Sequence, residues 1–354
     1  MQTLVCFISN NPENLELALY PHTSNFTDNT KLLILDTKAT HCKNEGIAKE
    51  LNAIHVCEED FRNSVKDEFK PLFQGQYGGN RNICLYHAFK ENAHAVFFDD
   101  DTTPFENPLA AYEKLFSEGR KIIAGKYLRH AHGTQHIIRD IVNAACAYAD
   151  REETKEKAQE NLFSLFCGIP PETQTPLKGA GIVGGNMGVH HDALKKYCFF
   201  PTDYRVEDGT YATLAKEFVG EEPFNEENNP AVYHNKIPKE NALLENLENE
   251  LKGSIIALCV KDSLEENELS MDTLEDKISR NASLAFKAFN LDYLQYKQRQ
   301  KNILEKAKEL EFEKEFSFML SLDEKTLAPS KEEAKRKMAL FDYAQENWEK
   351  ALVE

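Results

Sequence analysis

The sequence is poor in positive charge for its length. Its 354 residues include 42 Lys and Arg against 59 Asp and Glu, which gives a formal net charge of −17. A surface that binds nucleic acid needs a local cation for each phosphate that it contacts. We therefore expect no nucleic-acid partner.

The sequence also lacks paired cysteines and long apolar runs. Its eight cysteines are scattered, with no C-x-x-C pair and no zinc-ligand spacing. No run approaches the roughly 18 apolar residues of a membrane span, and the opening "MQTLVCFISNN" lacks the charged and long apolar parts of a signal peptide. These absences predict reduced thiols and a cytoplasmic protein without a membrane span.

What is present over residues 3 to about 100 is an alternation of short apolar runs with helical stretches. The apolar runs "TLVCFIS", "KLLILD", "AIHVCEE" and "HAVFFDDD" have the length of buried strands, and "KIIAGKYL" at 121–128 has the pattern of a single further strand. Strands with longer connections between them favour the α/β class, a mostly parallel sheet flanked by helices. In such sheets, ligands bind beyond the carboxyl ends of the strands.

Two further segments are predicted to be helical. The segment from about residue 137 to about residue 166 has the pattern of a helical insertion. The Glu- and Lys-rich sequence from about residue 237 has apolar residues at helical spacing. We expect one domain over 1–236 and an α-helical C-terminal region over 237–354. Its charge runs suit solvated helix faces, and a peripheral membrane contact or self-association into a homo-oligomer is the alternative.

Three consecutive carboxylates end the apolar run "AVFFDDD". Asp99 and Asp101, one residue apart after a strand, can share a divalent cation, and Asp100 would then face a sugar or ribose hydroxyl. The same stretch continues into "TTPFENP", so the acids also suit the start of a helix, where negative charge is favourable. The residues alone leave both interpretations open.

Later motifs give these acids a context. A glycine-rich stretch over 179–188 contains "GGNMG", the segment "VEDGTYA" has an acidic pair at a helix start, and "AVYH" is a strand-like run that ends in a histidine. Together with "LLILD", "GGNRN" and "FFDDD", this ordered set resembles the GT-A class of nucleotide-sugar-dependent glycosyltransferases, and most of all its family-two-like group. The resemblance covers residues of about 3–236.

The resemblance implies a donor site and a metal site. It assigns nucleotide-sugar binding to Ser9, Asn10, Asp36, Arg81, Asp99 and Asp100, with a UDP- or GDP-sugar as the expected donor. It assigns the metal to Asp99, Asp101 and His234, and an imidazole in a mostly oxygen site suits Mn2+ and tolerates Mg2+. The alternatives are a turn residue for Asp36, a surface ion pair for Arg81 and a structural histidine at 234.

The resemblance also implies an acceptor side. Gly185, Asn186 and Met187 would bind a carbohydrate or other hydroxyl acceptor, Asp208 would act as the base of an inverting transfer, and Glu207 would orient the acceptor or the loop. Alternatively, Glu207 and Asp208 only stabilise a helix N-terminus. His130, His132 and His136 form a further cluster whose role stays open between a metal site, an acceptor-facing loop and ordinary polar residues.

Other classes of function remain as rivals. A retaining GT-A enzyme would need no acidic base of this kind, and the sequence departs from the family in its first loop and in an absent aromatic R/W motif. A nucleotidyltransferase should have a glycine-rich loop with a basic residue after the first strand, where this chain reads "SNNPENLEL". A glycoside hydrolase would have its two carboxylates on either side of a sugar cleft, whereas these acids cluster as a metal pair. A noncatalytic sugar-binding protein is disfavoured because the acids are retained at every position that the resemblance implies.

Overall fold

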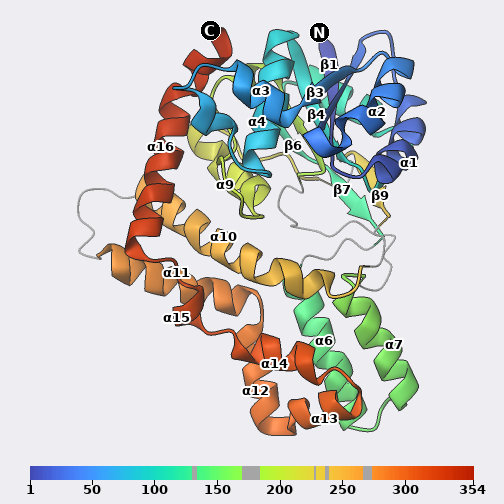
Figure 1. Cartoon of the computed structure of the whole chain (residues 1–354), viewed down its shortest axis with the longest axis vertical. Coiled ribbons are helices and arrows are strands. Elements are labelled where there is room, and N and C mark those ends of the chain that lie inside the picture. The colour runs from blue at the N-terminus through green and yellow to red at the C-terminus, as the bar shows by residue number, and fades with distance from the viewer. Residues whose placement is uncertain (130–133, 170–183, 227–228, 236–238, 266–272) are drawn as a thin grey trace. The chain divides into compact units, whose positions relative to one another are not determined.

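The computed structural model describes residues 1–129, 134–169, 184–226, 229–235, 239–265 and 273–354 (Figure 1). The chain divides into two compact units, each of which is discontinuous in sequence. The first unit comprises Met1–Arg129, Thr173–Asn235 and Ala339–Glu354. The second comprises His130–Glu172 and Lys236–Met338. The expected domain boundary near residue 236 stays a prediction. The segment His130–Glu172 belongs to the same compact unit as Lys236–Met338.

Within the described residues, the first unit contains a six-stranded sheet of order β3-β2-β1-β4-β8-β6. The first four of these strands run parallel, and β8 and β6 continue the sheet in antiparallel pairs. Their bounds are β1 Gln2–Ser9, β2 Thr30–Asp36, β3 Ile54–Cys57, β4 Ala93–Asp99, β6 Ile122–Ala124 and β8 Asn186–Val189. The inner parallel strands are almost wholly buried, as expected for a sheet covered on both faces. The α/β fold class predicted from the sequence is confirmed.

The helices of this unit occupy the connections between its strands. Helix α4 packs against β1 and β4, and the residues "GGNRN" form its beginning. The bounds are α1 Pro12–Thr23, α2 Lys38–Glu50, α3 Glu58–Ser64, the 3-10 helix η1 Lys70–Phe73, α4 Gly78–Lys90, α5 Pro108–Ser117, α8 His191–Leu194 and α9 Glu207–Val219.

A second, three-stranded sheet of order β5-β9-β7 lies in the same unit. Its strands are β5 Thr102–Pro104, β7 Lys126–Leu128 and β9 Ala231–His234. The single strand predicted for "KIIAGKYL" is therefore wrong: β6 and β7 belong to different sheets. They separate at Gly125, where a Cβ would lie 2.3 Å from the Asn186 Cγ, because that amide fills the gap between the sheets.

The helix-start interpretation of the three aspartates is also wrong. Strand β5 begins at Thr102, directly after them, and α5 begins later at Pro108. Asn107 caps α5 and accepts a hydrogen bond from the Ala110 amide at 2.9 Å. None of the three aspartates caps α5, so helix capping does not explain why their charges are clustered.

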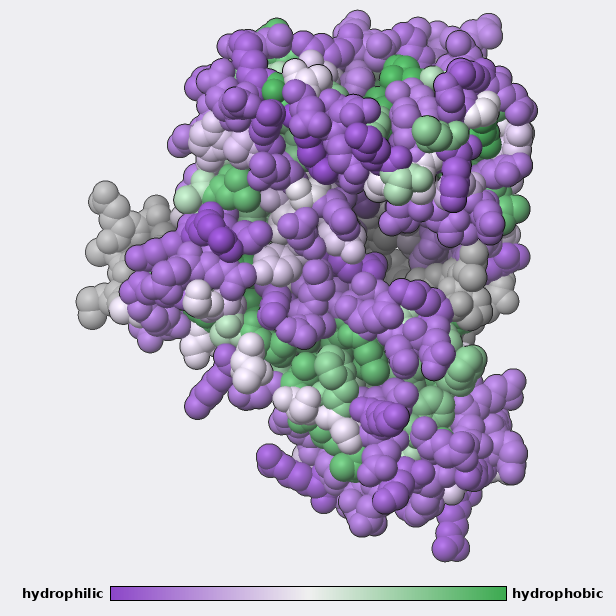
Figure 2. All heavy atoms as spheres, in the orientation of Figure 1, coloured by the Kyte–Doolittle hydropathy of each residue, from purple (hydrophilic) through white to green (hydrophobic). Residues whose placement is uncertain are grey.

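The second unit is helical in its described residues. It contains α6 Thr134–Ala149, α7 Lys155–Phe166, α10 Ala242–Glu265, α11 Leu274–Ala288, α12 Leu291–Lys301, α13 Ile303–Glu309, α14 Glu313–Ser321 and α15 Glu324–Leu327. The predicted helical insertion and helical C-terminal region are both present. Figure 2 shows hydrophilic side chains over most of the visible face and a patch of apolar ones over the helices of this unit. Self-association through these helices stays a prediction.

Helix α16, Lys331–Val353, starts in the second unit and continues into the first. Its residues from 339 onward belong to the first unit, where the Trp348 Nε1 donates to the Leu194 carbonyl at 2.6 Å and the indole is fully buried. The Gln345 amide exchanges two hydrogen bonds of 3.1 Å with the Cys198 backbone. The sheet-containing unit is therefore completed by the C-terminal part of α16, which follows the helical unit in sequence.

Two further expectations concern membranes and thiols. Among the helices that the structure describes, we find none that combines the length and apolarity of a bilayer span. All eight cysteines lie in described residues and are free, and Cys42 alone among them is exposed.

Candidate active site

The candidate site lies where the sheet changes direction of winding. Strand β1 pairs with β2 on one side and with β4 on the other, so the chain leaves β1 in one direction and returns on the opposite side. Ligands of open α/β sheets bind in the crevice at such a switch point, beyond the carboxyl ends of the strands. Here the Ser9 hydroxyl donates a hydrogen bond to the Asp100 carboxylate across that point.

Asp99 ends β4 and is held from two directions. The Tyr127 hydroxyl donates to the Asp99 Oδ2 at 3.0 Å, and the Asp99 amide donates to the Gly185 carbonyl at 2.9 Å. A Cβ at Gly185 would lie 1.8 Å from the Asp99 Cγ, so only glycine fits beside this carboxylate. The glycine-rich stretch thus permits a close backbone approach to the acid.

Asp101 and His234 meet because of the second sheet. In the antiparallel pairing of β5 with β9, Thr102 lies opposite His234. The His234 Nε2 lies 3.0 Å from the Asp101 Oδ2, and the imidazole stacks on the Tyr127 ring at 4.5 Å between centroids. Tyr127 therefore contacts both the Asp99 carboxylate and the His234 ring, and it lies between the three predicted metal ligands. These three are not among the groups of described residues whose ligand atoms already lie within 4.8 Å of one another.

The electrostatics of the aspartates indicate a shortage of positive charge. Burial raises the pKa of Asp99, with Asp101 adding to the rise and Arg81 opposing it. Burial also raises the pKa of Asp100 to about 7, with further increases from Asp99 and Asp101 and a decrease from the Ser9 hydrogen bond. A divalent cation among these carboxylates would relieve both their burial and their mutual repulsion.

Arg81 does not lie on the surface. From the first turn of α4 its Nε donates to the Glu207 Oε1 at 3.0 Å, and its Nη1 donates to the Gly184 carbonyl at 2.6 Å. Burial acts to lower the pKa of Arg81, but the carboxylates of Glu207, Asp99 and Asp208 outweigh it and raise the pKa. The alternative of a surface ion pair is wrong, and the guanidinium is committed to its own chain.

The acidic pair begins α9 and is anchored differently in its two members. Glu207 is buried, and burial followed by the neighbouring Asp208 raises its pKa against the opposing effect of Arg81. Asp208 is half-buried, and its two carboxylate oxygens accept hydrogen bonds from the backbone amides of Gly184 at 2.7 Å and Gly209 at 2.6 Å. Both acids therefore fix the same glycine turn that packs on Asp99.

The predicted acceptor residues divide into one turn residue and two core residues. Gly185 lies beside Asp99, whereas Met187 is fully buried in β8, opposite Phe97 of β4 and Ala124 of β6. The Asn186 Nδ2 donates to the Lys126 carbonyl at 2.9 Å and the Pro230 carbonyl at 3.2 Å, and its Oδ1 accepts from the Tyr112 hydroxyl. Contact of the Asn186 and Met187 side chains with an acceptor does not agree with this burial.

Asp36 ends β2 and lies opposite Ser9 in the parallel register, at the edge where it was predicted. Its carboxylate, however, contacts His41, Asn44 and His55 of its own βαβ segment at 2.7–2.8 Å. Asn10 is exposed at the end of β1. The sequence motifs therefore identified the right edge of the sheet, but Asp36 already has partners there.

Sequence reasoning missed several residues that organise the site. Tyr127 was taken as part of an ordinary strand, and its one signal is the preceding Gly125, which separates the two sheets. His41, Asn44 and His55 carry no motif. Of the histidine cluster, His130 and His132 lie outside the described residues, and His136 lies in α6 of the second unit.

Comparison with known proteins gives structural similarities of low score. No family model matches the sequence, and no curated protein matches it at a significant level. Glucosyl-3-phosphoglycerate synthase from Mycobacterium tuberculosis, in complex with phosphoglyceric acid, is 16% identical with a TM-score of 0.41, over 75% of this chain and 81% of that chain. A complex of the same synthase with Mn2+, uridine-diphosphate-glucose and phosphoglyceric acid is 16% identical with a TM-score of 0.41, over 77% and 83%.

A third similar structure is mouse xyloside xylosyltransferase 1 in its apo form. It is 13% identical with a TM-score of 0.32, over 62% of this chain and 73% of that chain. Because these TM-scores lie below 0.5, the similarities do not bear on the reaction of this chain.

Proposed function

We propose that this protein is a metal-dependent glycosyltransferase, which moves a sugar from a nucleotide-sugar donor to a hydroxyl acceptor. The observation that carries the proposal is the convergence of two acidic groups on one glycine turn at the switch point of the sheet. Asp99 packs on Gly185, and Asp208 binds the amide of Gly184. A group of metal-type acids and a separate, anchored acid beside one turn suit donor activation and acceptor deprotonation.

The residues at the end of β4 have the ligand types of a divalent-cation site. Their ligand atoms are not among the groups of described residues that already lie within 4.8 Å of one another, so these side chains would have to move closer together around an ion. Asp99, Asp101 and His234 offer carboxylate oxygens and one imidazole nitrogen, a donor set that suits Mn2+ and tolerates Mg2+. The raised pKa of Asp99 supports the assignment, because a bound cation would compensate the burial and repulsion that raise it. When bound, the ion would supply positive charge to the diphosphate of the donor as the leaving group departs.

The donor would lie along the carboxyl ends of β1 and β4. Asn10 is exposed there, and the buried Ser9 and the half-buried Asp100 pair at the base of that edge. Asp100 would receive a sugar or ribose hydroxyl, as the sequence predicted. Arg81 is not assigned to the diphosphate, because its guanidinium is hydrogen-bonded to the Glu207 carboxylate and the Gly184 carbonyl. Neutralisation of the diphosphate would then fall to the metal.

Asp208 is the proposed base. Each of its oxygens accepts one backbone hydrogen bond, and a carboxylate oxygen has a second lone pair with which to accept a hydroxyl proton. In the proposed step, the acceptor oxygen attacks the anomeric carbon, the bond from that carbon to the diphosphate breaks, and the acceptor proton passes to Asp208. A single displacement of this kind inverts the anomeric configuration. Glu207 would position the turn through Arg81.

The test uses the full-length protein after treatment with a chelator. UDP-, GDP- and CMP-sugars are added with and without Mn2+, and thermal unfolding and release of nucleoside diphosphate are measured. A donor at 100 times its dissociation constant should stabilise the protein by about 2.7 kcal/mol, and only when Mn2+ is present. Asp101→Asn is the matched variant that should lose the Mn2+-dependent part.

Two results would overturn the proposal. One is donor stabilisation of equal size with and without metal. The other is release of pyrophosphate from a nucleoside triphosphate and a sugar phosphate, which would indicate a nucleotidyltransferase. A product with retained anomeric configuration would still be the product of a glycosyltransferase, but it would rule out Asp208 as the base of an inverting transfer.

A further inference from the structure

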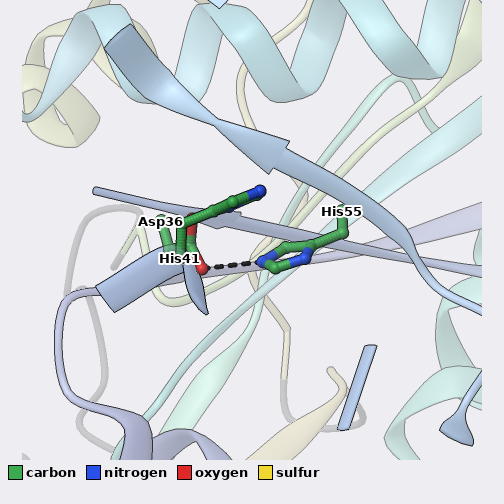
Figure 3. Close-up of side chains that lie close together, drawn as sticks. All are labelled: Asp36, His41 and His55. Carbon is green, nitrogen blue, oxygen red and sulfur yellow. Dashed lines mark hydrogen bonds and ion pairs between the residues drawn. The ribbon is translucent and has the colours of Figure 1, made fainter. Parts of the chain in front are cut away.

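A second cluster of metal-type ligands lies on β2, α2 and β3, apart from the three aspartates. Figure 3 shows its members, Asp36, His41 and His55. Asp36 ends β2, His41 lies in the first turns of α2, and His55 lies in β3, the strand next to β2. The His41 Nδ1 is 2.7 Å from the Asp36 Oδ1, and the His55 Nε2 is 2.8 Å from the Asp36 Oδ2.

The donor atoms are close enough to share one ion. One carboxylate oxygen and one nitrogen from each imidazole all lie within 4.8 Å of one another. Tetrahedral zinc with bonds of about 2.0–2.2 Å needs its ligand atoms about 3.3 Å apart. The hydrogen-bonded separations of 2.7 and 2.8 Å are shorter than that, so the side chains would open around an ion. The two imidazole rings would also rotate out of their present stacking, because the nitrogen lone pairs lie in the ring planes.

The charge of Asp36 favours a cation at this place. Its side chain is fully buried, and its partners within the described part of the chain are His41, His55 and Asn44. None of these is a lysine or an arginine. A buried carboxylate without a permanent positive partner is costly, and a bound divalent ion would supply that partner.

The cluster is supported from outside and open on one side. The Asn44 Nδ2 donates to the Asp36 Oδ2 at 2.8 Å, the kind of outer hydrogen bond that orients a metal-binding carboxylate. The two imidazole rings are stacked, with centroids 3.9 Å apart. The His55 side chain is 12% exposed and the His41 side chain is 31% exposed, so an ion would enter, and keep a water ligand, on the His41 side.

We infer that Asp36, His41 and His55 form a binding site for a transition-metal ion of the Zn2+ class, which joins β2, α2 and β3 of one crossover. Two imidazoles and one carboxylate suit Zn2+, whereas the pair of aspartates with one histidine at β4 suits Mn2+ or Mg2+. The inference does not rest on the proposed transferase activity. It assigns Asp36 to a metal, and so removes its carboxylate from contact with the nucleotide.

The experiment measures Zn2+ binding to the chelator-treated full chain by equilibrium dialysis, with Co2+ as a spectroscopic probe. Asp101→Asn serves as the background, because it disables the other candidate metal site. We expect one Zn2+ per chain and the visible absorption of a tetrahedral Co2+ centre. His41→Ala should weaken Zn2+ binding at least 100-fold and abolish the Co2+ bands.

Controls keep the outcome interpretable. His191 is a half-buried histidine at the start of α8, outside the cluster. Its variant His191→Ala should leave the Zn2+ affinity and the Co2+ absorption unchanged. His41 is the most exposed of the three ligands, so its variant should fold, and His55→Ala gives a second variant if circular dichroism shows that it folds. The inference is overturned by absence of stoichiometric Zn2+ binding, or by binding and Co2+ bands that persist in folded His41→Ala.

Discussion

The Arg81 Nε donates a hydrogen bond to the Glu207 Oε1 at 3.0 Å, across 126 positions of sequence. Both side chains are buried, with 12% and 5% of their surfaces exposed, and the guanidinium also lies over the rings of Phe97 and Phe199. The pair joins the start of α4 to the start of α9. It therefore holds the glycine turn between the two acidic groups of the proposed site.

Arg81→Met should strongly destabilise the protein, because it leaves Glu207 buried without its cation. Breaking a buried pair in this way costs about 3–5 kcal/mol. Unfolding in urea, followed by circular dichroism, measures the change. Lys49→Met is the matched control, since Lys49 pairs with Glu45 on the exposed face of α2 and should cost no more than about 0.5 kcal/mol.

The double variant Arg81→Met with Glu207→Leu separates charge from packing. If the loss in Arg81→Met comes from an unpaired carboxylate, removal of that carboxylate should restore most of the stability. Losses that simply add would show that the side chains matter mainly for packing.

Gly185→Ala should impair metal binding more than it impairs the fold. The new Cβ would overlap the Asp99 carboxylate, which must then move, and overpacking of this kind costs about 1–3 kcal/mol. Mn2+ affinity, measured by calorimetry, should fall along with the stability. Gly46→Ala in the middle of α2 meets no atom within 4 Å and should be neutral or slightly stabilising. Equal Mn2+ affinity in the two variants would contradict a metal role for Asp99.

The stability of the metal-free protein should fall as the pH rises from about 4 to about 7. In this window the folded chain keeps a proton on Asp100, whose pKa burial raises to about 7 from an ordinary 3.8, whereas the unfolded chain has released it. The slope of the unfolding free energy against pH is therefore negative for this group, with an upper bound of about 4 kcal/mol over the window.

Asp100→Asn isolates this contribution, because the amide oxygen can still accept the Ser9 hydrogen bond but carries no charge. Urea melts at several pH values give the unfolding free energy of each protein. The amount by which the Asp100→Asn variant exceeds the unaltered protein in this free energy should increase with pH up to about 7 and then stay constant. A flat difference would contradict the raised pKa.

Asp208→Asn should cut the transfer rate by about 10²- to 10⁴-fold while Mn2+ and donor binding persist, as expected when a general base is removed. The amide nitrogen would face one of the two backbone amides that now bind the carboxylate, so some loss of stability, about 1–3 kcal/mol, is also expected. Single-turnover rates per folded molecule and proton NMR of the product are the measurements. A rate close to that of the unaltered protein would remove Asp208 from catalysis.

The sequence predicted the central strands and the edge of the sheet that carries the acids. These strands are short apolar runs, and two of them, β2 and β4, end in a carboxylate, so their length and these ends can be recognised from neighbouring residues. The sequence did not predict that "KIIAGKYL" divides between two sheets. That division depends on the Asn186 amide reaching the carbonyls of Lys126 and Pro230, a contact between distant segments. Helical stretches were recognised for the same reason as the strands, since their apolar residues repeat locally.

Side-chain partners were harder to predict than elements. The resemblance assigned Arg81 to the nucleotide-sugar, whose diphosphate a guanidinium can bind. The buried Glu207 carboxylate is an equally good partner for a guanidinium, and it lies in the same chain. Asp36 was placed at the right strand end, yet its contact with His55 follows from the pairing of β2 with β3, which no local pattern contains. Residue type indicated what could bind, and only tertiary pairing decided the partner.

Helix α16 has a consequence for the order in which the protein can mature. Its residues from 339 onward bury Trp348 in the sheet-containing unit, although Trp348 lies 114 positions after His234, the last residue of β9. At a synthesis rate of about 5–20 residues per second, that interval lasts roughly 6–23 s. During this time, the backbone of Cys198 and the carbonyl of Leu194 lack the hydrogen bonds that they later form with the side chains of Gln345 and Trp348. The sheet-containing unit therefore gains these contacts only after the helical unit has been synthesised.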